Sequence, residues 1–172
     1  MIYMKKKIAA VFLAMTLMAN SAAVFAATPK ISTEQKAAIV DHCDTIRENL
    51  RNVQRQDSRA RVYYGRYYET ISSKFMLPLN TRLVENNLLS DSLLNTQTKF
   101  TKLRSDFSND FIEYQKILEE LVTTDCKNEP EKFYELLETA RTKRDYVNQD
   151  ATDLRKIITT HVELVTSLEE SL

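Results

Sequence analysis

The residue types most suited to chemistry gather around the two cysteines of the chain, Cys43 and Cys126. A histidine and several aspartates adjoin them in the sequence: Asp41, His42, Asp44 and Asp125. Thiolate, imidazole and carboxylate groups are common zinc ligands. The pattern lacks a second nearby histidine and a Cys-x-x-Cys spacing, and adjacent residues of a helix point in different directions. We therefore predict no metal centre and no bound cofactor.

The same two cysteines fit a disulfide, which oxidising compartments outside the cytosol allow. In an up-down-up helical bundle, the second link returns to the end at which the first helix begins. Cys126 lies in that link, and Cys43 lies about three turns into the first helix, so the two residues would meet. In an extended rod they would be much further apart than the roughly 7 Å between Cα atoms that a disulfide tolerates. We predict a Cys43–Cys126 disulfide.

Other catalytic patterns are missing from the sequence. His161 lies in an apolar row of the last helical stretch, with no second histidine or cysteine near it in the pattern. A nucleophilic triad therefore lacks its parts. The sequence also has no glycine-rich phosphate loop and no Glu-x-x-His motif of a di-iron bundle. We predict no catalytic residues and a protein that is not an enzyme.

Arginine and tyrosine are concentrated in one short stretch, and Arg–Tyr surfaces are enriched at protein interfaces. Side chains that flank the apolar row there form a candidate interaction patch: Arg59, Arg61, Tyr63, Arg66 and Tyr68. Tyr64 and Tyr67 belong to the apolar row itself and are expected in the core. Gly65, the only glycine of the chain, is interpreted as permitting close approach of another backbone. The alternative is ordinary packing with amphipathic rims.

Residues 1–26 have the three-part layout of a secretory signal peptide. Lysines at positions 5–7 precede an apolar run over 8–19, and a stretch with many small residues over 20–27 contains a candidate cleavage motif, Val24-Phe25-Ala26. The alternative is an uncleaved membrane anchor over residues 8–27, a stretch about long enough to span a bilayer. We expect a secreted, periplasmic or cell-envelope protein that contacts the membrane only if this leader is retained.

The charge balance argues against binding to nucleic acid. The chain has 24 basic and 24 acidic residues, and the leader holds three of the lysines and no acid. Cleavage after residue 26 would therefore leave a slight acidic excess. Nucleic-acid binders usually show a basic excess or a basic stripe. We expect no nucleic-acid partner.

Apolar residues recur at alternating steps of three and four, which is the pattern of long helices that pack as coiled coils. This pattern predicts helices over about 33–76, 81–123 and 129–172. Ser32, with Gln35 three residues on, is a capping-box start for the first of them. The links between them are short, and short links favour antiparallel neighbours. We predict an all-α fold in which a single domain, residues 27–172, forms an up-down-up three-helix antiparallel bundle. The alternative is a kinked rod in which Pro78 bends one helix without reversing it.

Two charged residues, Asp57 and Arg144, interrupt the apolar rows of the first and third predicted helices. In the predicted bundle these two helices run parallel, and the two residues lie at similar heights. We predict an interior Asp57–Arg144 pair, with Arg141 as a substitute, that fixes the register of the helices more than it adds stability. The alternative is that each side chain reaches water separately.

These patterns predict a broad class of function rather than a specific activity. The leading hypothesis is an exported, non-enzymatic helical-bundle protein that acts as a structural or interaction module, with another protein or a second copy as its partner. The first alternative is a periplasmic-type chaperone or carrier that holds clients or lipids in a groove between helices. It predicts exposed apolar residues near the first link: Phe75, Met76, Leu77, Leu88 and Leu94. The second alternative is a membrane-anchored helical spacer.

Overall fold

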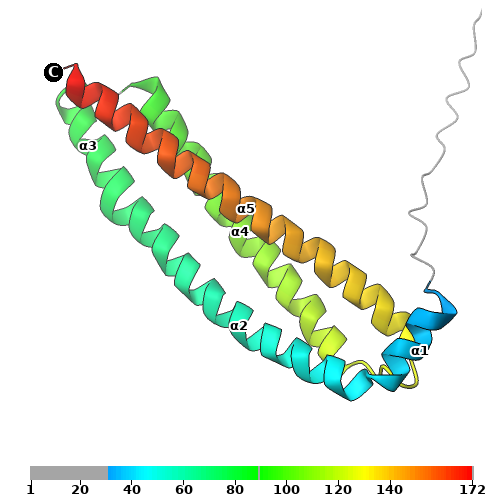
Figure 1. Ribbon diagram of the computed structural model, residues 1–172. Coiled ribbons are helices and arrows are strands. Elements are labelled where there is room, and N and C mark those ends of the chain that lie inside the picture. Colours follow the sequence, from blue (N-terminus) through cyan, green and yellow to red (C-terminus); the bar gives the residue numbers. More distant parts are fainter. Residues whose placement is uncertain (1–30, 89, 172) are drawn as a thin grey trace, which may run out of the picture.

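A computed structural model describes residues 31–88 and 90–171, which are almost entirely helical (Figure 1). Within these ranges no strand is present, so the prediction of an all-α fold is confirmed. The elements in chain order are α1 (Thr33–Asp41), α2 (Cys43–Thr70), the π-helical segment η1 (Ile71–Met76), α3 (Leu77–Glu85), α4 (Asp91–Thr123) and α5 (Pro130–Glu170). The predicted leader lies outside the described residues.

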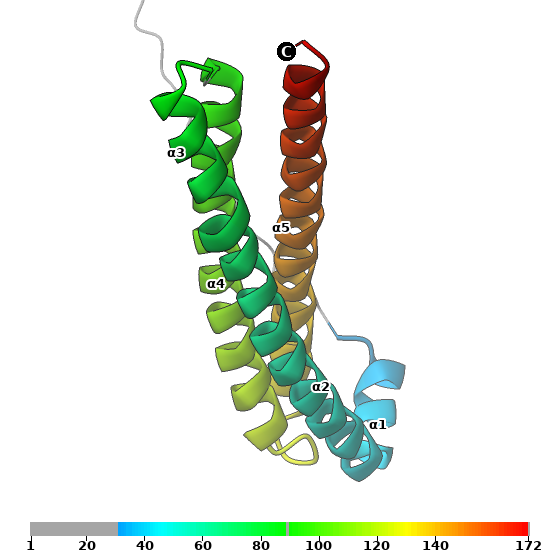
Figure 2. The same ribbon diagram turned by 90° about the vertical axis from the view of Figure 1, so that its left-hand side faces the viewer.

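The described residues form four helices rather than the three predicted, if the continuous run α2–η1–α3 is counted as one. The additional helix is α1, which begins at the predicted capping box between Ser32 and Gln35. It ends because His42 leaves the helical conformation, with φ −108° and ψ 13°. This break turns α1 toward the start of α5 (Figure 2), where Lys36 pairs with Glu131.

The first reversal of the chain lies further along than the sequence suggested, at residues 86–90 instead of 77–80. Pro78 does not end the helix because it follows the π-helical turn of η1, in which the Leu77 N–H bonds to the Ser72 carbonyl. Proline costs a helix one hydrogen bond and a clash with the preceding turn, and a wider π turn accommodates both. The chain instead turns at Asn87, whose φ is 58°. Asparagine tolerates this left-handed conformation better than most residues.

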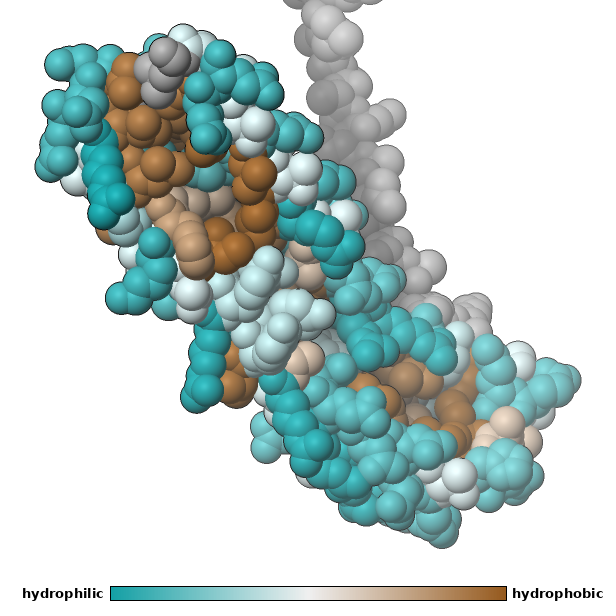
Figure 3. All heavy atoms as spheres, turned by 60° about the vertical axis from the view of Figure 1, so that its left-hand side comes forward, coloured by the Kyte–Doolittle hydropathy of each residue, from teal (hydrophilic) through white to brown (hydrophobic). Residues whose placement is uncertain are grey.

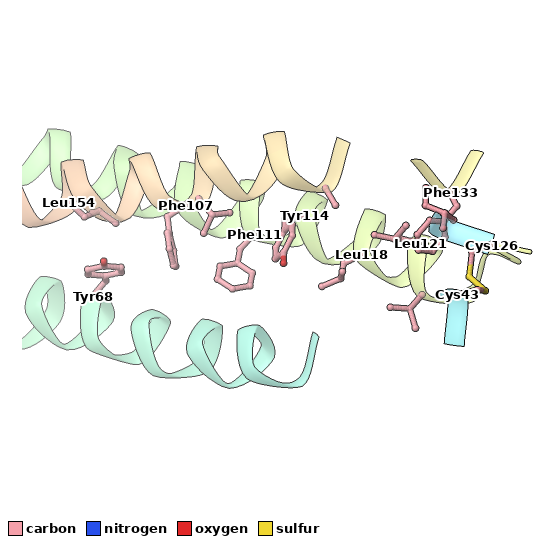
Figure 4. Packing of buried hydrophobic residues seen from close by; sticks show 14 of the residues in the cluster. Cys43, Tyr68, Phe107, Phe111, Tyr114, Leu118, Leu121, Cys126, Phe133 and Leu154 are labelled. Carbon is pink, nitrogen blue, oxygen red and sulfur yellow. A yellow bond between two sulfur atoms is a disulfide. The ribbon is translucent and has the colours of Figure 1, made fainter. Parts of the chain in front are cut away.

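The three long rods lie side by side, as two views at right angles agree (Figures 1 and 2). The helix α4 runs opposite to both α2 and α5, because the chain reverses at each link. The helices α4 and α5 form the most closely packed pair, and the backbone of α2 approaches α4 but, within the described ranges, not α5. The core therefore centres on α4, whose inward row is rich in aromatic side chains: Phe100, Phe107, Phe111 and Tyr114. Figure 4 shows the last three of them.

Candidate interaction surface

One end of the bundle, which we call the disulfide end, is closed by a bond between Cys43 and Cys126. Their Cα atoms are 5.6 Å apart, and both side chains are almost fully buried. Figure 4 shows Leu121 and Phe133 beside the bridge, and both are fully buried. Because the sulfur atoms bond to each other, neither is available as a thiolate ligand. The described residues contain no group of three or more histidine, cysteine or acidic side chains placed to hold a metal ion.

The middle of the bundle brings Asp57 and Arg144 together. A nitrogen of the Arg144 guanidinium lies 3.2 Å from Asp57 Oδ1, and the Tyr114 hydroxyl donates a 2.7 Å hydrogen bond to Asp57 Oδ2. Burial, followed by this hydrogen bond, raises the pKa of Tyr114. The Asp57 side chain is 15% exposed but that of Arg144 is 51% exposed, so the pair lies at the rim rather than in the interior. Arg141 pairs with Glu138 instead.

A second carboxylate, Asp150 on α5, is held in an unfavourable environment at the interface with α4. Burial is the main cause that raises its pKa to about 6, and the negative charge of Asp110 adds to the effect. Its Oδ2 atom is buried without a hydrogen-bond partner. A proton on Asp150 would let this carboxyl group donate to Asp110, so the two acids favour a shared proton.

The aromatic residues of α2 do not divide between core and surface as predicted. Tyr68, placed in the exposed patch by the sequence, is only 4% exposed and packs edge-on against Phe107. Tyr64 and Tyr67, predicted as core residues, are 40% and 45% exposed. The reason is helical drift: a straight α-helix has 3.6 residues per turn, so its inward position moves away from a strict 3.5-residue repeat over several turns.

The other members of the predicted patch lie at the surface of α2, with Arg61 partly buried through its hydrogen bond to Gln115. A shallow depression on α2 is lined by residues of this helix alone: Ser58, Arg59, Val62, Tyr63, Arg66, Tyr67 and Thr70. No other part of the described chain packs closely against Gly65, because a Cβ atom at this position would meet no atom within 4 Å. That interpretation of the glycine is therefore wrong.

Exposed apolar side chains are concentrated on α2–η1–α3, beyond the middle of the bundle. They include Val62, Tyr63, Tyr64, Tyr67, Phe75, Leu77 and Val84, and Leu94 and Val162 add to them from α4 and α5. Figure 3 shows hydrophobic side chains gathered around a hollow on this face of the molecule. Of the residues predicted near the first link, Met76 is buried, Leu88 is half-buried and the other three are exposed. If the inward positions of α2 are spaced by 3.6 residues per turn instead of 3.5, Tyr67 falls on the exposed side of the helix.

The end opposite the disulfide, which we call the open end, comprises α3, the start of α4 and the last turns of α5. Within the described ranges α3 and α5 make no close backbone approach, and their ribbons diverge in Figure 2. A buried polar layer lies beneath this end, where Thr96 Oγ1 is 2.9 Å from His161 Nδ1 and Asn80 bonds to Gln97. Burial lowers the pKa of His161, and its Nε2 atom has no hydrogen-bond partner.

The chain therefore belongs to the broad class of disulfide-linked, all-helical bundle proteins. A comparison with known proteins finds no matching family model, no matching curated protein and no matching solved structure. Across the described ranges, no helix combines the length and the apolar character that crossing a membrane requires.

Proposed function

We propose that this protein is an exported, non-enzymatic helical bundle that works as an interaction module, with α2–η1–α3 as its docking surface. The observation that carries the proposal is the concentration of exposed apolar and aromatic side chains between residues 62 and 84 of this one run. Large exposed apolar patches on a protein surface commonly mark binding surfaces. Arginine and tyrosine, which are enriched at interfaces, occupy the same stretch of α2.

The three-helix, up-down-up form of the bundle, with α1 as an added arm, suits this role. The disulfide and the close α4–α5 pair hold a rigid frame, on which α2–η1–α3 is presented along one side. A rigid docking surface loses less conformational entropy on binding than a mobile one. The signal-peptide and envelope predictions fit a disulfide, because disulfides persist in oxidising compartments.

The test is site-specific photo-crosslinking in cells that produce the full chain. A photoreactive residue replaces Tyr63 or, as a control of similar exposure on α5, Tyr146. We expect a discrete crosslinked product at position 63 and none at position 146. Equal yields at the two positions, or no product at position 63, would contradict the proposed docking surface.

A carrier or chaperone function is a second candidate, supported by two observations. A hollow between α2 and α5 is lined by Tyr64, Tyr68, Arg155 and Ile158 among others, and Phe75 in η1 and Leu77 at the start of α3 are exposed. An apolar ligand with an anionic head would suit the rings and the guanidinium. Saturable binding of a fluorescent fatty acid by the purified monomer, lost in Ile158→Asp, would favour this function over the interaction module.

A further inference from the structure

The outer face of α2 carries a row of arginines, of which only Arg55 has a side-chain partner within the described residues, Asn52 on the same helix. Its residues, Arg51, Arg55, Arg59, Val62, Tyr63 and Arg66, share one side of the helix and are exposed. Residues 51–66 include five arginines and one aspartate, and the aspartate is Asp57, already bound by Arg144 and Tyr114. Among the described residues, Arg51, Arg59 and Arg66 form no ion pair and no side-chain hydrogen bond. A surface of this kind attracts an acidic partner.

The same chain contains an acidic surface of matching design at the open end. Its C-terminal segment, residues 162–170 of α5, has three glutamates and no basic residue. Glu163, Glu169 and Glu170 are exposed beside Val162, and none forms an ion pair within the described ranges. The apolar residues Leu164, Val165 and Leu168 are only half-buried. The segment is an acidic amphipathic helix whose apolar face the described part of the monomer covers only in part.

The positive charges on α2 and the negative charges on the C-terminal segment have the same spacing along their helices. Arg59 and Arg66 are seven residues apart, and so are Glu163 and Glu170. Residues seven apart lie on the same side of a helix, two turns from each other. Each charge pair also has exposed apolar surface beside it, from Val62 and Tyr63 on α2 and from Val162 on α5.

We propose that a second copy of this chain docks its C-terminal segment on the outer face of α2, and that the contact is reciprocal. Two outer faces cannot pair with each other, because their arginines would repel. The helix α5 runs in the same direction as α2, so in a second copy related by a two-fold axis perpendicular to the helices it runs antiparallel to α2. Arg59 then faces Glu170 of the second copy, and Arg66 faces its Glu163. Two such contacts close a symmetric dimer.

This dimer rests on the proposed function and deepens it by naming the partner. It also accounts for the location of the exposed side chains. Phe75 lies in η1 and Leu77 begins α3, so both follow the outer face along the chain, and we expect an antiparallel overlap to cover them as well. Burying apolar surface supplies affinity, whereas the charge pairs select the antiparallel arrangement.

A charge exchange tests the dimer, with sedimentation velocity of the purified full chain over a range of concentrations as the readout. We expect the wild type to dimerise in the micromolar range and more weakly as salt is raised. The variant R59E/R66E and, separately, the variant E163R/E170R should each raise the dimer dissociation constant about tenfold or more. The fourfold variant that combines them should recover most of the loss, because it restores opposite charges in each pair.

The matched control is K99E/K116E, which reverses two exposed positive charges on α4, a helix that belongs to neither surface. It should dimerise like the wild type, and circular dichroism should show every variant to be folded. A wild type that stays monomeric, a control as weak as R59E/R66E, or a fourfold variant without recovery would each overturn the dimer. A monomeric protein that binds anionic phospholipid vesicles would instead identify the arginine row as a lipid-binding face. If Tyr63 crosslinks to a different protein while the chain stays monomeric, the dimer fails and the proposed function stands.

Discussion

The disulfide end and the open end are built from the same long helices, but the helices are held together differently at the two ends. At the disulfide end a covalent bond joins α2 to the link before α5, and α1 folds back as an additional cover. At the open end α3 and α5 stay apart, and the buried layer beneath them is polar. The comparison shows that the covalent closure is confined to one end, and that exposed apolar side chains such as Leu77 and Val84 lie toward the other.

The largest expected effect comes from removing the bond that distinguishes the two ends. In Cys43→Ser/Cys126→Ser, the free energy of unfolding should fall by up to about 4 kcal/mol, because the bond closes a long loop in the unfolded chain. Denaturant unfolding measures the change. As the control, a reducing agent should lower the stability of the wild type to that of the variant and should leave the variant itself unchanged. If the wild type and the variant were equally stable under oxidising conditions, the disulfide would not be what distinguishes the two ends.

Asp150 lies between the two ends and should respond to pH. Its ordinary pKa of 3.8 is raised to about 6 by folding, so the folded state binds more protons than the unfolded state between these values. The free energy of unfolding contributed by this group therefore falls as pH rises from about 4 to above 6. At pH 7, Asp150→Asn should stabilise the protein by about 1 to 2 kcal/mol, after allowance for solvent screening.

Thermal melts of Asp150→Asn and the wild type at pH 4 and pH 7 measure this effect. The gain should be present at pH 7 and largely absent at pH 4, where the wild-type carboxyl group is protonated. The control Asp145→Asn, an exposed acid on the same helix, should show little change at either pH. A gain of the same size at both pH values would show that the charge of Asp150 is not its cause.

The Asp57–Arg144 pair tests whether the middle of the bundle fixes the register of α2 against α5. A double-mutant cycle with Asp57→Ala and Arg144→Ala should give a coupling of about 0.5 to 1 kcal/mol, because one partner is half-exposed. Urea unfolding of the four proteins measures it. If the two single losses simply add, the side chains do not cooperate and the register must be set by apolar packing alone.

An effect as small as this coupling, but of stabilising sign, is expected at Gly65, on the helix that faces the proposed partner. A Cβ atom there meets nothing within 4 Å, so Gly65→Ala should stabilise α2 by about 0.5 to 1 kcal/mol. A small rise in melting temperature, with dimerisation retained, is the expected result. A loss of stability would show that the backbone at Gly65 requires a conformation that alanine resists.

Local signals in the sequence predict much of this molecule. The heptad pattern identifies the long helices, and the all-α class follows from it. The position of the second link, together with the antiparallel order, brings Cys43 and Cys126 to the same end. The Ser32 capping box is also as predicted, because the hydrogen bonds of a cap involve residues only three apart.

Two kinds of feature could not be predicted from local signals: those that depend on small angular errors adding up along a helix, and those that depend on how two helices pack against each other. Proline is a local signal, but whether Pro78 ends a helix depends on the π turn before it. Asn87 and the N-capping Ser90 carry the turn signal that was missed. The exposure of Tyr64 and Tyr67 depends on drift over many turns, and the pairing of Asp110 with Asp150 requires the relative position of α4 and α5.

Hydrogen–deuterium exchange on the dilute, monomeric full chain tests the difference between the two ends most directly. Amide protection depends on local unfolding, which a disulfide and a packed apolar core suppress. We predict strong protection around Cys43 and over residues 118–137, and much weaker protection in α3 and in residues 158–170. Equal protection at both ends, or stronger protection at the open end, would contradict the account.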